Sequence, residues 1–450
     1  MAGRLLRPKR AFPLVDVDEP NLLRYEFPYS EPPKITFDGA SVPMEFPDEI
    51  FITDTTFRDG QQAREPYSVQ QIVELFDMLN RLSGPRGVIR QSEFFLYTDK
   101  DKEALRKCLE RGYRYPEITG WIRAVKSDFK LVKDMGLKET GMLTSSSDYH
   151  IFKKLGKTRP QAMEGYLEVV RAALEAGVKP RCHFEDATRA DLYGFLIPFA
   201  IELMKLADES KVAIKIRICD TMGYAVPWAE ASAPRGVPKM IHAFRHDAGV
   251  PAAQLEWHGH NDFHKTVINS TTAWLHGCAS VNGTLMMTGE RTGNTPIEAM
   301  IFDYIQLMGG MADIDTTVIT DITLYYRDRL GMAIPHNYPF CGSGFNVTMA
   351  GIHVDGVSKD EEIYNIFDTA KLLKRPLGVT ITDKSGVAGV AFWVNEYLHL
   401  QGDTRIDKRH PGVQAAYADL MVQYNAGRTS GMSPDEMLAL AKKHLPDHFT

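Results

Sequence analysis

The sequence has few cysteines, and none of them lies close to another. Only five of the 450 residues are cysteine, and no two form a CxxC pair. An odd number of widely separated thiols excludes a fully paired disulfide framework and lacks the spacing of a zinc module. We therefore expect buried, reduced thiols and a cytoplasmic protein. The five are Cys108, Cys182, Cys219, Cys278 and Cys341.

Long hydrophobic runs and a strong excess of one charge are also missing. No apolar stretch reaches the roughly 18 to 20 residues that span a bilayer. The basic start, residues 1–10, has no continuous apolar core of the kind found in secretory signals. The formal net charge is −6, which argues against a dedicated nucleic-acid binder. We expect neither a membrane nor a nucleic acid as partner.

Between residues 49 and 308, short β-like runs alternate with helical patterns. Eight such runs predict an α/β fold, specifically a (β/α)8 TIM barrel. A doubly wound open sheet is the rival, but no GxGxxG follows the first run, which disfavours it. The eight runs are Ile50–Asp54, Val88–Phe95, Tyr115–Thr119, Glu139–Leu143, Lys179–Phe184, Val212–Cys219, Gln254–Trp257 and Ser280–Met286.

Different patterns flank this region. Residues 1–47 are rich in proline and charge, and we expect an N-terminal extended arm over the surface or a neighbouring subunit. Residues 48–310 are expected to form the barrel, whose clearest helix is Gln161–Ala176, stopped by Gly177. Residues 311–450 predict a helical C-terminal region without strands. Its helices are expected at Ser358–Leu373, Val387–Leu400, Val413–Tyr424 and Pro434–Lys443, the last capped by Ser433.

Acidic and imidazole side chains follow two of the β-like runs. Asp59 lies just past the first run, and His258 and His260 end the seventh. Barrel active sites lie at the carboxyl ends of strands, and side chains two apart on a strand project together. Asn294, after the eighth run, can add an amide oxygen. Either motif alone is compatible with an ordinary turn or strand end. Together they predict a site for a divalent metal, with Mn or Mg favoured and Co or Zn possible.

These residues belong to motifs that resemble a known family. Asp54–Gln62 fits D-x-T-x-R-[DE]-G-x-Q, and Gly289–Asn294 fits G-x-R-x-G-N. With the HxH pair, they are similar to the metal-dependent barrel superfamily that includes 2-isopropylmalate synthase, homocitrate synthase and hydroxymethylglutaryl-CoA lyase. Glu185–Arg189 and Asp220–Tyr224 also look like family blocks, and the resemblance runs from about residue 48 to 370.

One further segment distinguishes branches of the superfamily. Ala350–Gly356 resembles the GIH segment of the synthases, which lies beyond the barrel and reaches over an active site, often that of the partner subunit. The lyases lack it. The resemblance implies a Claisen condensation of acetyl-CoA with a metal-chelated 2-oxo acid, followed by thioester hydrolysis, in a homodimer. Without the family, His353 would read as an ordinary histidine in a glycine-rich turn.

The resemblance also implies roles for individual side chains. Arg58, beside the metal ligand Asp59, would stabilise negative charge on an enolate or alkoxide. Glu185, His353 and Tyr364 would form the relay that takes a proton from the weakly acidic thioester methyl, with the identity of the base left open. The substrate-side candidates are Gln62, Thr221, Arg189 and Glu290.

Departures from the family patterns bear on the oxo acid. His150 and Ile151 lie where homocitrate synthases place an arginine for 2-oxoglutarate. Thr348 replaces a histidine that is common in the synthases, and no leucine-sensing domain follows Leu373. The stretch Phe57–Arg64, with the long arm, most resembles the Re-type citrate synthases, which use oxaloacetate. The alternatives are a homocitrate or 2-isopropylmalate synthase, a hydroxy-acyl-CoA lyase or aldolase, and a non-catalytic barrel. Candidates for the second carboxylate of oxaloacetate are Arg64, Arg123 and Arg189.

Overall fold

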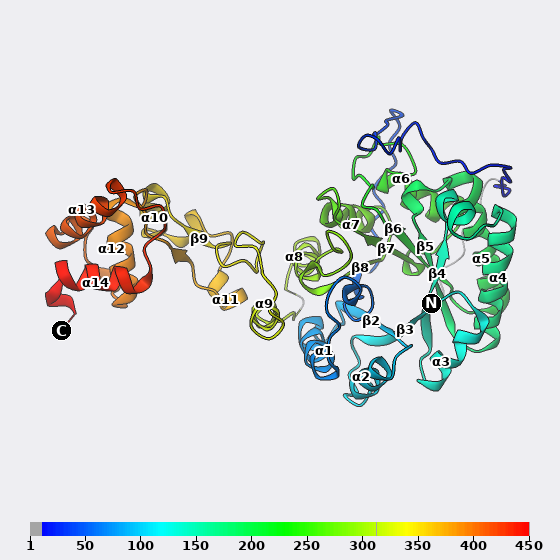
Figure 1. Ribbon diagram of the computed structural model, residues 1–450, viewed down its shortest axis with the longest axis horizontal. Coiled ribbons are helices and arrows are strands. Elements are labelled where there is room, and N and C mark those ends of the chain that lie inside the picture. Colours follow the sequence, from blue (N-terminus) through cyan, green and yellow to red (C-terminus); the bar gives the residue numbers. More distant parts are fainter. Residues whose placement is uncertain (1–10, 312, 450) are drawn as a thin grey trace. The chain divides into compact units, whose positions relative to one another are not determined.

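The computed structural model describes residues 11–311 and 313–449, and the chain divides after Asp315 into two compact units. In the first unit, eight parallel strands pair in chain order and close into a barrel where β8 pairs with β1 (Figure 1). The expected (β/α)8 barrel is confirmed. The strands are β1 (Phe51–Asp54), β2 (Ile89–Phe95), β3 (Glu117–Ile122), β4 (Glu139–Ser145), β5 (Lys179–Glu185), β6 (Lys215–Asp220), β7 (Leu255–Gly259) and β8 (Ser280–Gly283).

Helices form the outer layer around the strands (Figure 1). The helix predicted over Gln161–Ala176 begins earlier, at Arg159, because the Thr158 side chain accepts the Gln161 N–H and caps the first turn. It ends before Gly177, whose φ of +73° suits a glycine in that place. The helices are α1 (Val69–Ser83), α2 (Asp99–Leu109), α3 (Phe129–Asp134), α4 (Arg159–Glu175), α5 (Ile197–Ser210), α6 (Val237–His242), α7 (Thr266–Leu275) and α8 (Ile297–Met308).

Strand bounds shift by one to three residues from the runs that the sequence indicates, and β6, expected from Val212, starts at Lys215; the shifts of two other strands have clear causes. The third is expected from Tyr115, but β3 starts at Glu117, since Pro116 has no N–H to donate to a ladder. The eighth is expected to reach Met286. Instead β8 stops at Gly283, and the chain turns with a φ of +54° at Met286.

The two faces of the barrel wall differ in polarity. On β5, Phe184 points outward and stacks on Phe199 of α5, with ring centroids 4.9 Å apart. The alternate residues Arg181 and His183 point inward and are 1% exposed. There Arg181 donates to Glu93 of β2 at 2.8 Å. The apolar core therefore lies between strands and helices, while the barrel interior carries buried charge.

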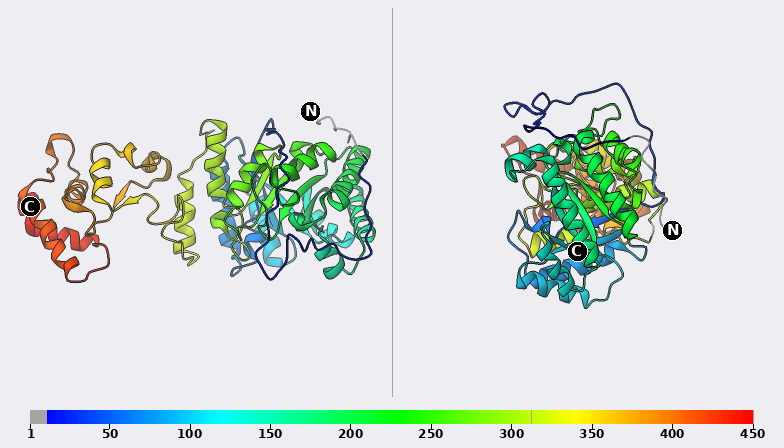
Figure 2. Two further views of the ribbon diagram at one scale, coloured as in Figure 1. Left: turned by 90° about the horizontal axis from the view of Figure 1, so that it is seen from above. Right: turned by 90° about the vertical axis from the view of Figure 1, so that its right-hand side faces the viewer.

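The N-terminal arm lies against the barrel within the first unit (Figure 2). The described part, residues 11–47, contains no helix. The Val15 N–H donates to the Gly194 carbonyl at 2.9 Å, and Phe37 forms an isolated antiparallel bridge with Ala231. Near the end of the arm, Glu45 pairs with His246 at 2.5 Å.

The second unit is mainly helical but contains a short parallel pair, β9 (Val347–Thr348) and β10 (Gly378–Val379). The expectation of a strand-free region is therefore wrong. The predicted helix Ser358–Leu373 is also wrong, because Asp360 and Asp368 accept nearby backbone N–H groups and break it. The helices are α9 (Val318–Asp328), α10 (Gly351–Val357), α11 (Thr369–Leu373), α12 (Gly386–Tyr397), α13 (Pro411–Asn425) and α14 (Pro434–His444).

The last three helices of the second unit share one apolar core. Val390 of α12, Leu420 of α13 and Leu440 of α14 are all buried in it. The Ser433 side chain accepts the Glu436 N–H in a capping box, which confirms the predicted start of α14. Among the described residues, no helix is both long and apolar enough to cross a membrane.

Candidate metal centre and active site

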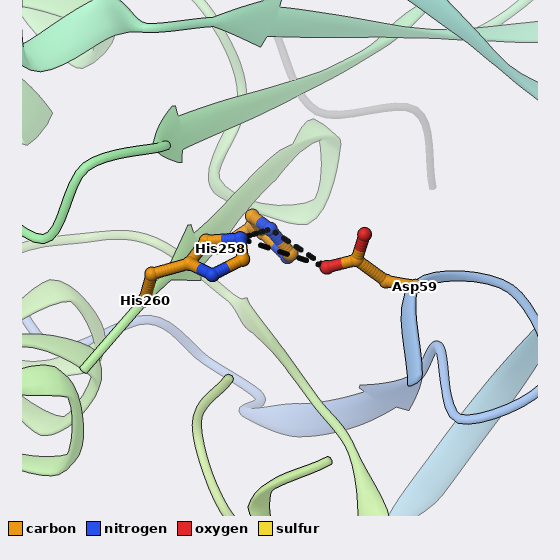
Figure 3. A group of neighbouring side chains, drawn as sticks. All are labelled: Asp59, His258 and His260. Carbon is orange, nitrogen blue, oxygen red and sulfur yellow. Dashed lines mark hydrogen bonds and ion pairs between the residues drawn. The ribbon is translucent and has the colours of Figure 1, made fainter. Parts of the chain in front are cut away.

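Three predicted ligands meet at the carboxyl ends of the strands (Figure 3). Asp59 begins a short turn after β1, His258 lies in β7, and His260 follows that strand. The backbone of His260 forms an antiparallel bridge with Asn294, which brings the loop after β8 to the same place. The strand order that closes the barrel thus gathers residues that are about 200 positions apart in sequence.

The ligand atoms are spaced as one metal ion would require. Asp59 Oδ2 lies 3.6 Å from the Nε2 atoms of both His258 and His260, and these two nitrogens are 3.3 Å apart. Ligands held about 2.1 Å from a common ion lie roughly 3 to 3.5 Å from each other. Among the described residues, this is the single group of acid, histidine and cysteine side chains with such convergence.

The protonation of these groups also suits a cation. Burial lowers the pKa of His258 to about 3 and lowers that of His260, so both rings are neutral at pH 7. Burial opposes ionisation of Asp59, but Arg58 and the two imidazoles outweigh it and lower the pKa of that carboxyl. The site therefore offers one carboxylate and two imidazole lone pairs.

The surrounding residues orient the ligands. Asn282 Oδ1 accepts the Nδ1–H of His258 at 2.7 Å, which leaves Nε2 without a proton and free to bind metal. Asn294 donates to Asp59 Oδ2 at 2.7 Å, while its own Oδ1 is buried without a hydrogen-bond partner. A Cβ on Gly289 would lie 2.8 Å from that oxygen, so glycine makes room for the amide. This unpartnered oxygen is the observation that favours Asn294 as a further ligand.

Arg58 joins the metal centre to the barrel interior. Its Nη1 donates to Asp59 Oδ1 at 2.7 Å and its Nε donates to Glu93 Oε2 at 3.0 Å. The guanidinium also lies over the Trp121 ring, 5.2 Å from its centroid. Its Nη2 makes a weak contact with His183 Nδ1, at 3.5 Å. Nη2 is therefore the nitrogen best able to donate to an anionic substrate.

The barrel interior contains a charged network that the sequence analysis missed. Glu93 accepts from Arg58, Arg181 and Arg217, and Arg217 also donates to Glu256. The sequence does contain a sign of this network, because the charged residues of the strands occupy alternate positions within runs that otherwise have the apolar composition of buried strands. With both histidines of the candidate metal site neutral, the four acidic and four basic charges of this set cancel, so a bound divalent ion would give it a net positive charge. The members are Asp59, Glu93, Glu139 and Glu256 against Arg58, Arg181, Lys215 and Arg217.

We expect the metal-free protein to lose stability as the pH falls below about 6.5. Burial lowers the pKa of His183 and His258 to about 3 and lowers that of His260, so the unfolded chain takes up these protons first. His183 and His258 each cost about 1.4 kcal/mol per pH unit below pH 6.5, and His260 adds a loss in the same direction. Burial raises the pKa of Asp54 and Asp220 to about 6, so the folded protein takes up protons at these two carboxyls as the pH falls, and this partly offsets the loss of stability. The three histidines outnumber the two carboxyls, so we expect a net loss. Urea unfolding from pH 7.5 to 4.5 measures this, and a constant free energy of unfolding would contradict it.

Glu185 ends β5 within a small polar cluster. Its carboxylate accepts from Ser145, and its Oε2 lies 3.1 Å from both His150 Nδ1 and Lys154 Nζ. Burial disfavours the charged form, but these neighbours outweigh burial and lower the pKa of Glu185 to about 2. In the sequence, His150 stands out only as a departure from homocitrate synthases, and no motif points to Lys154. Both lie in the π-helical turn after β4, Tyr149–Lys154.

The four substrate-side candidates have different surroundings. Thr221 Oγ1 accepts the Asp186 N–H at 2.8 Å, which leaves its own O–H to donate. Arg189 pairs with Asp186 at 2.9 Å and stacks on the Tyr149 ring. Gln62 is exposed, with Oε1 3.5 Å from Arg58 Nη1. The Glu290 side chain is 55% exposed, and its Oε2 lies 3.8 Å from Arg291 Nη1.

Two other arginines were candidates for a distal carboxylate. Arg123 donates twice to Asp128 at 3.0 Å and is largely exposed. Arg64 lies over the Tyr67 ring, 4.1 Å from its centroid. Arg123 is thus committed to a local acid, as Arg189 is.

His353 and Tyr364 belong to the second unit and are neighbours there. His353 lies in α10 and Tyr364 follows a short turn, with ring centroids 4.3 Å apart. A Cβ on Gly356 would lie 2.6 Å from the tyrosine ring, so this glycine allows the pair to form. Both side chains are exposed on their unit.

Comparison with known proteins places the chain in a family. Residues 49–324 match the HMGL-like family model. The citrate (Re)-synthase of Syntrophus aciditrophicus is 60% identical over 97% of this chain and 70% of that protein. That of Clostridium kluyveri is 51% identical over 97% of this chain and 96% of that protein. A 2-phosphinomethylmalate synthase of Streptomyces hygroscopicus is 36% identical, covering 94% and 96%.

The solved structures show a likeness of fold. A hydroxymethylglutaryl-CoA lyase from Pseudomonas aeruginosa superposes with a TM-score of 0.50 at 17% identity, over 64% of this chain and 95% of that one. At this identity the likeness shows the fold alone. The family model and the relatives together give the assignment: the chain belongs to the HMGL-like family and, within it, groups with the citrate (Re)-synthases.

Proposed function

We propose that this protein condenses acetyl-CoA with oxaloacetate and water to give citrate and CoA, by the Re-face route. The observation that carries the proposal is the identity of 60% and 51% to citrate (Re)-synthases along 97% of the chain. The converging Asp59, His258 and His260 support a metal-dependent form of the reaction. The related 2-isopropylmalate and homocitrate synthases are 30% and 27% identical, which makes their substrates weaker alternatives.

The proposed metal site consists of Asp59, His258, His260 and Asn294, with Mn or Mg as the favoured ion. A divalent ion here would act as a Lewis acid on the keto group of the oxo acid. Two imidazoles with oxygen ligands also tolerate Co and Zn. The neutral histidines and the unpartnered oxygen of Asn294 support this ligand set.

Arg58 is the proposed anion-stabilising group. Glu93 and Asp59 hold its Nε and Nη1, so the guanidinium plane is fixed before any substrate arrives. A donor aimed in advance at developing negative charge needs no reorganisation during the reaction. Its Nη2 would donate to the enolate or alkoxide oxygen.

Glu185, His353 and Tyr364 are the proposed proton-transfer residues. A carboxyl with a pKa of about 2 holds a proton poorly. Glu185 is therefore proposed to take part in the proton relay and not to be the final proton acceptor. His353, whose exposed ring lies beside Tyr364, is the residue proposed to accept the proton. Both groups are exposed on the second unit, which supports an action on substrate bound elsewhere, and we propose a homodimer in which the partner barrel holds it.

The proposed substrate contacts involve the remaining candidates. Thr221, whose O–H is available, would donate to the oxo-acid carboxylate. Gln62 and Glu290 lie on exposed loops and would line the CoA side. Arg189 is held by Asp186 and would act indirectly, by fixing the loop after β5. All five cysteines are buried and free of disulfides, which supports a cytoplasmic location.

A panel of oxo acids tests the proposed activity. We expect CoA release from acetyl-CoA and Mn²⁺ with oxaloacetate, and turnover at least tenfold lower with 2-oxoglutarate or 2-oxoisovalerate. Citrate made from labelled acetyl-CoA would carry the label in the carboxymethyl arm that forms when the acetyl group adds to the Re face of oxaloacetate. Strong turnover with either other oxo acid and none with oxaloacetate would reject the citrate assignment. Cleavage of hydroxymethylglutaryl-CoA would favour the lyase alternative, and a failure to turn over any substrate would favour a non-catalytic barrel.

A further inference from the structure

Buried hydrogen bonds inside the barrel join the two sides of the candidate metal centre. On one side, His258 Nδ1 donates to Asn282 Oδ1 at 2.7 Å, and Asn282 Nδ2 donates to Thr53 Oγ1 at 2.9 Å. The Thr53 hydroxyl in turn donates to Glu256 Oε1. The carboxylate of Glu256 is thus linked to the ring orientation of a metal ligand through two neutral side chains.

On the other side, the same chain of bonds returns to the second ligand. Glu256 Oε2 accepts from Arg217 Nε at 3.0 Å, and Arg217 Nη1 donates to Glu93 Oε2 at 3.0 Å. Glu93 Oε2 also accepts from Arg58 Nε at 3.0 Å, and Arg58 Nη1 donates to Asp59 Oδ1. We call this series the buried circuit. It comprises His258, Asn282, Thr53, Glu256, Arg217, Glu93, Arg58 and Asp59.

Every member of the buried circuit is well shielded from solvent. Arg217 and Asn282 are 0% exposed, and Arg58, the most accessible member, is 8% exposed. Bonds between ionised groups are stronger and more directional in such an environment, and networks of them polarise one another. Burial keeps bulk water from replacing a lost bond. A change at one bond therefore has to be taken up by neighbouring protein groups, most of which belong to the circuit.

We propose that Thr53 and Arg217 are positioning residues for the metal centre. Thr53 fixes the Asn282 amide, which fixes the tautomer and rotation of His258. Arg217 bridges Glu256 and Glu93, and it holds Arg58 against Asp59 through Glu93. Neither residue touches the ion or the substrate, and both act on the geometry of groups that do. The inference rests on the metal site of the proposed function.

Removal of the Thr53 hydroxyl is the cleanest test, because it changes neither charge nor shape. In Thr53→Val, Glu256 still pairs with Arg217 and the Asn282 amide still reaches the Thr53 carbonyl at 3.3 Å, so the fold should hold. Loss of a partner that bonds directly to a metal ligand typically weakens metal binding 10- to 100-fold, and Thr53 lies one bond further out, so the lower end of that range, about tenfold, is expected. We expect that loss for Mn²⁺, measured by calorimetric titration of metal-free protein without substrates, and recovery in Thr53→Ser.

A matched control separates positioning from packing. Thr144 of β4 is equally buried, and its hydroxyl donates to the His183 carbonyl outside the circuit. Thr144→Val should bind Mn²⁺ as the wild type does. Arg217→Lys keeps the charge but cannot bridge both carboxylates, and we expect an affinity loss of similar size.

The outcomes are distinct. Equal Mn²⁺ affinity in wild type, Thr53→Val and Thr144→Val would overturn the positioning role while leaving the metal site intact. A similar loss in both valine variants would also overturn it, because packing would then be the cause. A wild-type protein that binds no Mn²⁺ would overturn the metal site and this inference with it. A wild-type protein that binds Mn²⁺ but lacks citrate synthesis would reject only the proposed activity.

Discussion

Replacement of His260 by alanine is expected to abolish metal binding and to lower turnover by about 10³-fold or more. The variant leaves Asp59 and His258 as the main ligands, and loss of the ion removes several kcal/mol of transition-state stabilisation. Manganese binding followed by calorimetry and CoA release followed spectroscopically measure the two effects. Because His260 lies after the strand end, the barrel should remain folded, with an unchanged circular dichroism spectrum.

His276 provides the matched control for this variant. It is also a buried histidine, but it ends α7 and bonds to the Thr272 carbonyl, away from the metal centre. His276→Ala should retain metal binding and activity. A His260→Ala protein that bound Mn²⁺ and turned over normally would reject the site altogether.

The second large effect is expected from Arg58→Lys. Lysine keeps the positive charge but lacks the planar fork that pairs Glu93 and Asp59 while presenting Nη2 to the substrate. Removal of one preorganised donor to a developing anion commonly lowers kcat by about 10²- to 10³-fold. We expect a loss in kcat of this size, with a smaller change in KM, in steady-state assays at saturating Mn²⁺.

Arg90→Lys is the control for this change. Arg90 lies near the amino end of β2 and pairs with Glu49 at 2.7 Å, at the end of the strand away from the metal centre. It should leave kcat within about twofold of the wild type, since an exposed ion pair contributes about 0 to 1 kcal/mol. An Arg58→Lys enzyme with wild-type kcat would remove Arg58 from the chemistry.

The sequence was sufficient for the fold and for the three converging ligands. Asp59, His258 and His260 follow from two rules, the alternation of side chains along a strand and the location of barrel active sites at strand carboxyl ends. Neither rule depends on knowing which strand residues face each other. The closed strand order, with β1 between β2 and β8, then brings the first and seventh strand ends close enough for one ion.

The buried circuit could not be predicted in the same way. Its bonds join β1, β2, β6, β7 and β8, so they depend on cross-strand register and on rotamers. The contact of His150 with Glu185 depends on a π-helical turn that no periodicity indicated. The helix expected over Ser358–Leu373 failed because side-chain capping at Asp368 competed with helical propensity.

The location of the buried circuit has a consequence for how such an enzyme can change. Arg217, Glu256 and Thr53 lie within strands, whereas Thr221, Gln62 and Glu290 lie in loops at the mouth. Ligand geometry is therefore set by the framework, whereas the proposed contacts with the oxo acid and CoA would be set by loop segments that tolerate substitution. Mutational drift in the loops can alter substrate preference while the ion keeps its coordination. A barrel of this construction is suited to acquiring new condensation partners without first losing its chemistry.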